Sequence, residues 1–356
     1  MADVTSDDLR AAVAAGTITE AQAASLLATA QTRSGLRIAE DEPFELFKGF
    51  AEIFVAVGIS ILIAGIVGLT MLFDGAEIAA LFYAGLAWAL ARYFTLKRRM
   101  MLPSIVLVCA YGAAALVLSS WVVSLIFSDP AAIMLPLVLT LLGVIGFLLL
   151  WFRTFRLPFT MFLVGLAGFG IALAISGNLD HESFGLAGLE SIFDLRTGSA
   201  LPFGTLVFGL LALAAGLWFD MRDPHRLGRN SAAGFWLHIL AAPALVNTVA
   251  LTFFNMGAGW GYVLLAFSLG LVAALALIID RRSFLTAGIG YLIFLIGYVL
   301  TDPSEPGSWA LVLFVVGLGL TGLGTFWTDL RLRLMRLLPD FPGKSRLPPY
   351  AKVTHD

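Results

Sequence analysis

A succession of apolar runs, each about long enough to cross a bilayer, is the strongest constraint on how this chain folds. A membrane-spanning helix needs about 20 apolar residues, because lipid offers the backbone no hydrogen-bond partners. Composition agrees, since 59% of the residues are hydrophobic and 13% are charged, whereas soluble domains are about 25% charged. The sequence therefore predicts an all-α integral membrane bundle of about ten transmembrane helices. We place them at roughly 51–73, 77–95, 103–127, 131–152, 157–176, 201–219, 233–254, 259–279, 283–301 and 308–327.

The distribution of Lys and Arg is an independent test of this span count. When the N-terminus and every second loop are assigned to one side of the membrane, that side holds all of the 22 Lys and Arg residues except Arg196. Lys and Arg are enriched in cytoplasmic loops. We therefore expect ten spans with the N-terminus and the C-terminus both cytoplasmic.

The N-terminal segment, residues 1–42, predicts a short soluble helical hairpin followed by a linker. Gly16 is typical of a residue that ends a helix. Thr19 with Gln22 three residues later is a capping box, which predicts the start of a second helix. We expect this segment to be cytoplasmic.

The ten-span region, residues 43–327, is followed by a basic segment, residues 328–356. Its alternating arginines and leucines predict an interfacial helix that stops at Pro339 and continues as an extended Pro-rich tail. The lipid bilayer is the first expected partner, and anionic lipid is a candidate partner at the basic cytoplasmic loops and tail. A net charge of −2 gives no basic footprint for nucleic acid.

The run at 233–254 contains three residues that are costly in a bilayer: His238, Pro243 and Asn247. Pro243 leaves the carbonyl of Ile239 without its helical donor. His238 and Asn247 are nine residues apart, which places them on opposite faces of a straight helix. We expect a kinked, buried helix whose polar groups face protein. These three residues are candidates for lining a functional cavity, and structural polar groups in a packed helix are the alternative.

The cytoplasmic segment FDMRDPHRLGRNS is the richest polar stretch between spans. Asp223, His225, Arg226 and Arg229, with Asp220 before them, are candidates for binding a phosphate headgroup. A solvated loop is the alternative interpretation. A headgroup enzyme acting here would depend on His225 or Asp223.

The sequence predicts no cofactor. The stretch GLGLTG matches the dinucleotide fingerprint, but it lies in the middle of an apolar run where no phosphate-binding turn is expected. The longest outer loop, 176–200, carries oxygen and imidazole donors for a divalent cation, with a solvated acidic loop as the alternative. No metal ligand set is assigned to it. Its candidate donors are Asp180, His181, Glu182, Glu190 and Asp194.

Three features resemble the bacterial membrane proteins of the DUF2157 family, whose activity is not established. They are the N-terminal AAGTITEAQAASLL, the glycine-spaced first run FAEIFVAVGISILIAGIVGL, and the many apolar runs that follow. The stretch DPHRLGRNSAAGFWLHILAAP is also similar to a segment of related proteobacterial membrane proteins. The resemblance implies a multi-pass protein of the bacterial inner membrane and supplies no catalytic residues.

Three functional hypotheses follow. In the first, the protein handles or transports a small or lipid-like substrate, with the run at 233–254 lining the cavity. The scarcity of carboxylates at mid-membrane argues against proton- or sodium-driven transport, although unwound helices can bind ions without them. In the second, the protein is a non-transporting scaffold or regulatory subunit that recruits a partner through its N-terminal hairpin or C-terminal tail. Neither of these makes it an enzyme; a lipid-headgroup enzyme that depends on His225 or Asp223 is the third hypothesis.

Overall fold

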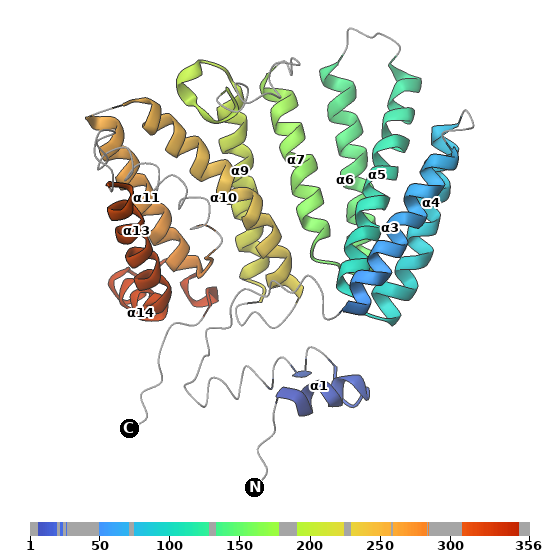
Figure 1. Ribbon diagram of the computed structural model, residues 1–356, viewed down its shortest axis with the longest axis horizontal. Helices are drawn as coiled ribbons and strands as arrows, with labels where there is room; N and C mark the ends of the chain where they lie inside the picture. The colour runs from blue at the N-terminus through green and yellow to red at the C-terminus, as the bar shows by residue number, and fades with distance from the viewer. Residues whose placement is uncertain are drawn as a thin grey trace. The chain divides into compact units, whose positions relative to one another are not determined.

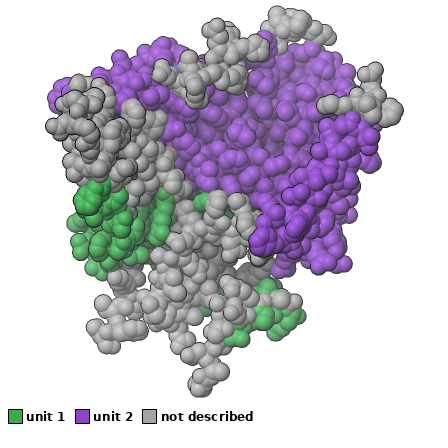
Figure 2. Space-filling model, in the orientation of Figure 1, with its two compact units in different colours: residues 1–43, 217–235, 270–356 green, residues 44–216, 236–269 purple. Residues whose placement is uncertain are grey.

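The computed structural model describes residues 6–19, 22–23, 26, 50–70, 75–127, 133–177, 191–223, 229–257, 259–282, 284 and 308–348. Within these residues every regular element is a helix (Figure 1). The chain divides into two compact units, coloured separately in Figure 2. Unit 1 comprises residues 1–43, 217–235 and 270–356, and unit 2 comprises residues 44–216 and 236–269.

Seven of the described helices are long and apolar enough to cross a membrane, so the chain is a multi-pass helical membrane protein. Each occupies one of the predicted apolar runs. They are α3 (Phe50–Thr70), α4 (Ala76–Ala91, continued by the π-helix η1, Arg92–Lys97), α5 (Met101–Ile126), α6 (Met134–Phe155), α9 (Leu201–Asp220), α10 (Arg229–Asn255) and α11 (Trp260–Ile279).

The three remaining predicted spans are not among these seven helices. The fifth run holds α7 (Thr160–Ser176), a shorter apolar helix of 17 residues. The tenth run holds α13 (Ser308–Thr325), and GLGLTG lies within it as continuous helix, so it forms no phosphate-binding loop. The ninth run, 283–301, falls almost entirely outside the described residues. The count of ten therefore stays a prediction.

The N-terminal capping box is confirmed by its hydrogen bonds. The backbone N–H of Thr19 donates to Gln22 Oε1 at 2.9 Å, and the N–H of Gln22 donates to Thr19 Oγ1 at 3.2 Å. Before it, α1 (Ser6–Ala14) ends ahead of Gly16, whose φ of +73° is the left-handed conformation that glycine adopts without strain. Most of the predicted second helix lies outside the described residues, so the complete hairpin stays a prediction.

In unit 2, α5 packs against α3, α4 and α6, and α6 packs against α7. These helices stand side by side in Figure 1. Lipid provides no hydrophobic force between helices, so close approach through small residues matters. On α4 that surface is a stripe of buried alanines: Ala80, Ala84, Ala87 and Ala91.

Glu52 ties α3 to the beginning of α5. Its carboxylate is buried and accepts hydrogen bonds from the backbone N–H groups of Met101 at 3.0 Å and Leu102 at 3.2 Å. The residue at the N-cap position of α5, Met100, provides no side-chain cap. The first N–H groups of a helix have no partner within it, so Glu52 supplies from another helix the cap that α5 lacks.

Arg196, the single cation on the predicted outer side, has a local structural partner. It lies in η3 (Leu195–Thr197) and its guanidinium donates to the carbonyl of Asn255 at the C-terminal end of α10. The Asn255 side chain in turn donates to Asp194 at 2.7 Å. A cation is favourable beside the unpaired carbonyls at a helix C-terminus, which accounts for this exception to the charge distribution.

The basic C-terminal helix, α14 (Trp327–Leu337), ends before Pro339 as expected and buries one face, formed by Trp327, Arg331 and Met335. The following residues, 338–348, are not the extended tail that we expected. They fold back, because buried cations bind their carbonyl groups. Arg331 donates to the carbonyl of Pro348 at 2.7 Å, and Lys344 donates to that of Leu338 at 2.8 Å.

Candidate functional site

The helix with the costly polar residues, α10, is the most deeply buried of the seven candidate spans. Half of its apolar window is buried, a larger share than in any of the other six. It passes Pro243 as one helix from Arg229 to Asn255. The expectation of a buried helix in this run is therefore confirmed.

His238 is completely buried and lies against the backbone of α9. A Cβ atom placed on Gly216 would stand 2.6 Å from Cε1 of the imidazole and 2.9 Å from each ring nitrogen. Real Cβ atoms essentially never approach so closely. Only glycine at position 216 lets the imidazole occupy this place.

Two further glycines bring neighbouring helices onto α10. A Cβ on Gly165 of α7 would lie 2.6 Å from Cδ1 of Leu240, and a Cβ on Gly209 of α9 would lie 2.8 Å from the Leu245 side chain. The leucines of α10 thus fill the space that these glycines leave. Glycines on α7 and α9 therefore let these two helices pack closely against α10.

The three cavity candidates are not brought into one site. His238 is buried, whereas Pro243 and Asn247 are half-buried, and nine residues of helix separate His238 from Asn247 by about 13 Å. Hydroxyl groups further along α10 bond to the helix itself, as in Thr248 Oγ1 to the carbonyl of Ala244 at 2.7 Å. These hydroxyl groups are therefore satisfied within α10 itself and are not gathered around a cavity with His238.

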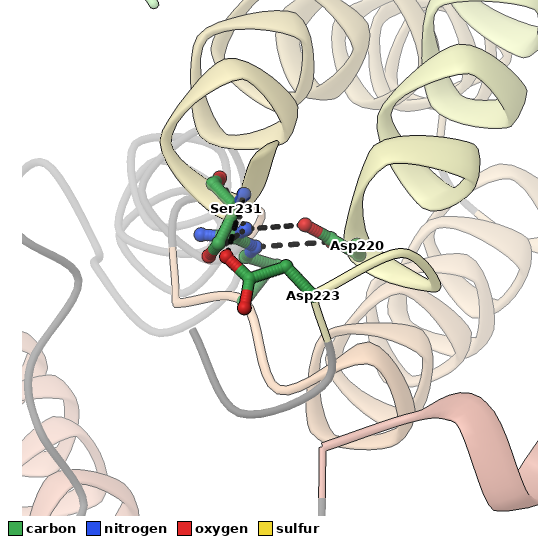
Figure 3. Close-up of polar contacts among 4 residues, drawn as sticks. Asp220, Asp223 and Ser231 are labelled. Atoms are coloured by element: carbon green, nitrogen blue, oxygen red, sulfur yellow. Dashed lines mark hydrogen bonds and ion pairs between the residues drawn. The ribbon is translucent and has the colours of Figure 1, made fainter. Parts of the chain in front are cut away.

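The second polar centre, in unit 1, is built around Arg281, the second residue after α11. Figure 3 shows Asp220, Asp223 and Ser231, the three labelled residues that meet there. Its guanidinium donates to both carboxylate oxygens of Asp220, with Nη2–Oδ1 at 2.5 Å and Nε–Oδ2 at 3.2 Å. Nη2 also donates to the carbonyl of Ser231 at 2.8 Å. Arg281 is fully buried and Asp220 is 3% exposed.

This centre ties three separated segments together. Asp220 ends α9, Ser231 lies in the first turn of α10, and Arg281 follows α11. The backbone N–H of Ser231 also donates to Asp223 at 3.3 Å. A two-pronged Arg–carboxylate pair fixes geometry as well as charge. Burial makes it expensive to remove either partner alone.

The predicted headgroup residues are only partly placed by the structure. Asp220 and Asp223 are engaged by Arg281 and Ser231, and Arg229 is exposed at the beginning of α10. His225 and Arg226 lie outside the described residues. Sequence reasoning missed Arg281 as the partner of Asp220, because 61 residues separate them and no local pattern links them.

The proposed metal donors of the outer loop are mostly untested. Asp180, His181, Glu182 and Glu190 lie outside the described residues. Asp194 already accepts hydrogen bonds from the N–H of Arg196 and from Asn255. Among the described residues, no group of three or more His, Cys, Asp or Glu side chains is arranged to hold a metal ion.

Comparison with known proteins gives no further guide to this site. No protein-family model, no curated protein and no solved structure matches the chain. The resemblance to the DUF2157 family therefore stays a prediction.

Proposed function

We propose that this multi-pass protein is a membrane scaffold or regulatory subunit that does not transport a substrate. The packing of α10 carries the proposal. The helix with the most polar side chains in the membrane is held by glycines of α7 and α9, and its histidine lies directly on the backbone at Gly216. A transport path needs polar groups that water or substrate can reach. Here the most promising such group is used to bring two helices together.

The segments that would recruit a partner lie outside the spans. In α14 the buried face of Trp327, Arg331 and Met335 leaves Arg333 and Arg336 exposed on another side of the helix. Within unit 1, Trp327 Nε1 donates to Asp280 at 2.8 Å and Arg331 Nε donates to the carbonyl of Leu277 at 2.9 Å. A helix anchored by one face presents its other face in a fixed orientation. The N-terminal segment, with its confirmed capping box, is the second recruiting element.

The test measures whether water reaches α10. The chain has one cysteine, Cys109, so a Cys109→Ala background accepts single reporter cysteines. His238→Cys and Asn247→Cys are treated with a membrane-impermeant maleimide, in vesicles of each orientation, for seconds to hours. Arg98→Cys, at an exposed turn position, is the positive control.

We expect the Arg98→Cys variant to be labelled from one face, and the His238→Cys and Asn247→Cys variants to resist labelling from both. Long exposure captures minor open states, so slow alternation would also be detected. Labelling at position 238 or 247 from either face would contradict the scaffold proposal.

Handling of a small or lipid-like substrate is the second candidate function, and one observation favours it. Asn247 and Pro243 are half-buried, so one side of α10 keeps a polar amide beside a helical position that lacks an N–H donor. A lipid-like molecule reaching α10 from the bilayer would meet these residues. Labelling confined to the Asn247→Cys variant would point to this function.

A further inference from the structure

The turn between α4 and α5 carries four cations within eight residues: Arg92, Lys97, Arg98 and Arg99. All four are exposed. Most of the turn is the π-helix η1, and π-helical turns in α-helices are frequent at functional sites. In the described part of residues 50–177 there are two acidic residues. The buried Glu52 is already bound to the backbone N–H groups of Met101 and Leu102, and Glu77 lies at the opposite end of α4.

Tyr93 holds two of these cations close together. Arg98 Nε donates to the Tyr93 hydroxyl at 3.1 Å, and its guanidinium carbon lies 5.6 Å from the centre of the Tyr93 ring. Lys97 Nζ lies 5.8 Å from the same ring centre. Like charges gathered at one ring repel each other, and a bound anion would offset that repulsion.

A second cationic turn lies at the same end of unit 2. Trp88, one turn before Arg92, contacts Trp151 and Phe155 of α6, with ring centres 5.6 and 5.0 Å apart. The π-helix η1 itself also packs against α6. The end of α6 therefore adds two more exposed cations, Arg153 and Arg156.

Two of the six arginines and lysines sit in a backbone conformation that favours glycine. Arg99 has a φ of 53° and Arg156 a φ of 49°. In this left-handed region a side chain costs conformational energy, which is why glycine usually ends helices in this way. Strained non-glycine residues cluster at binding sites, where the surrounding structure holds them in this conformation.

We propose that these two turns form a binding site for the phosphate of an anionic lipid headgroup. The site consists of Arg92, Lys97, Arg98 and Arg99 with Arg153 and Arg156. Both turns leave directly from apolar helices, α4 and α6, so their cations stand at the level of the headgroups. Arginine pairs with phosphate through two parallel hydrogen bonds, and each basic residue at the surface strengthens the attraction. This proposal does not depend on whether the protein recruits a partner.

Native mass spectrometry of the full chain tests the proposal by counting retained lipids. The protein is given phosphatidylglycerol or phosphatidylcholine with identical acyl chains. We expect preferential retention of phosphatidylglycerol, and roughly a hundred-fold weaker retention after the triple change Lys97→Gln, Arg98→Gln and Arg156→Gln. The control neutralises two cations of unit 1 that lie outside both the proposed site and α14, Arg222→Gln and Arg282→Gln. Its loss of retention is compared with that of the matched double variant, Lys97→Gln with Arg98→Gln.

A single variant separates binding from folding. Arg156→Gly removes one charge and also relieves the left-handed strain, so it should be at least as resistant to heat as the unaltered chain. Its retention of phosphatidylglycerol should nevertheless fall about five-fold. Loss of retention without loss of stability is a result that misfolding cannot produce.

Three outcomes would overturn the proposal. Equal retention of the two lipids would show no preference for anionic headgroups and would leave an acidic protein segment as the occupant. Equal losses in the double variant and its two-residue control would show that general cytoplasmic charge, and not this site, holds the lipid. Displacement of the lipid by an equal concentration of glycerol phosphate would assign the site to a soluble phosphate.

Discussion

His238 and Arg281 show how single polar residues are accommodated in this protein. Each is fully buried, and each has a specific neighbour that makes the burial possible. For His238 that neighbour is Gly216, whose lack of a side chain leaves room for the imidazole. For Arg281 it is the carboxylate of Asp220. The two neighbours act differently: the carboxylate offsets the cost of burying the Arg281 charge, whereas Gly216 supplies the imidazole only with room.

Gly216→Ala should destabilise the protein by about 1–3 kcal/mol, because the new methyl group would overlap the imidazole of His238. Gly85→Ala is the control, since a Cβ there meets nothing within 4 Å, and it should be neutral or slightly stabilising. Unfolding in mixed detergent micelles measures both. A His238→Ala change should recover much of the loss in the Gly216→Ala background. An unchanged free energy of unfolding for Gly216→Ala would refute the close contact.

Asp220→Asn should cost about 3–5 kcal/mol, because it leaves the buried guanidinium of Arg281 without its counter-charge. Replacing both partners, with Asp220→Leu and Arg281→Met, should recover most of the stability. The same unfolding titration applies. Arg222→Gln, which removes an exposed cation lying 3.5 Å from the Trp218 ring centre, should cost no more than about 1 kcal/mol. Similar losses for Asp220→Asn and Arg222→Gln would contradict the importance of the buried pair.

At the scale of the element, side chains from elsewhere in the fold complete the helix ends. Glu52 of α3 binds the first N–H groups of α5. At C-terminal helix ends the partners are cations. Arg196 binds the carbonyl of Asn255 in the last turn of α10, and Arg331 binds the carbonyl of Leu277 in the last turn of α11. The acid meets N–H donors and the cations meet carbonyl acceptors, as the helix dipole requires. These capping contacts fix which helix ends lie together.

Glu52→Ala should therefore weaken the protein by about 1.5–3 kcal/mol, the range for hydrogen bonds to a charged group. Glu52→Gln keeps an acceptor oxygen and should lose less. Glu77→Gln is the matched control, because Glu77 lies in the first turn of its own helix, where a carboxylate contributes about 0.3–1 kcal/mol. Thermal stability in detergent ranks the three variants. If the Glu77→Gln variant were less stable than the Glu52→Ala variant, the cap that Glu52 provides to α5 would be excluded.

At the scale of the whole molecule, the number of spans and the side of each terminus are linked. An odd number of spans places the two termini on opposite sides of the membrane, and an even number places them on the same side. Seven described helices satisfy the length and hydropathy of a span. The distribution of Lys and Arg predicts ten spans. The difference consists of α7, α13 and the run at 283–301.

Reporter fusions decide the count. A fluorescent protein that matures only in the cytoplasm, fused after residue 282 or after residue 346, should be bright. The same protein fused after residue 305 should be dark, and a phosphatase active only outside should be active there. If fusions after residues 282 and 305 report the same side, the run at 283–301 does not cross the membrane and the ten-span topology is wrong.

The sequence by itself determined the solvent, the helical class and the position of most helices. Whether a helix crosses the membrane depends on the length and hydropathy of that one apolar run. The capping box likewise depends on two residues that are three positions apart, Thr19 and Gln22. Local pattern was therefore enough.

Only the tertiary structure decided which residues meet. Glu52 binds Met101, which is 49 residues away along the chain, and Asp220 binds Arg281, which is 61 residues away. The imidazole of His238 lies where a Cβ on Gly216 would stand. Lipid satisfies every apolar helix face equally well. Hydropathy therefore cannot predict which face of a helix packs against another helix. That packing depends on side-chain shape and on hydrogen bonds between helices.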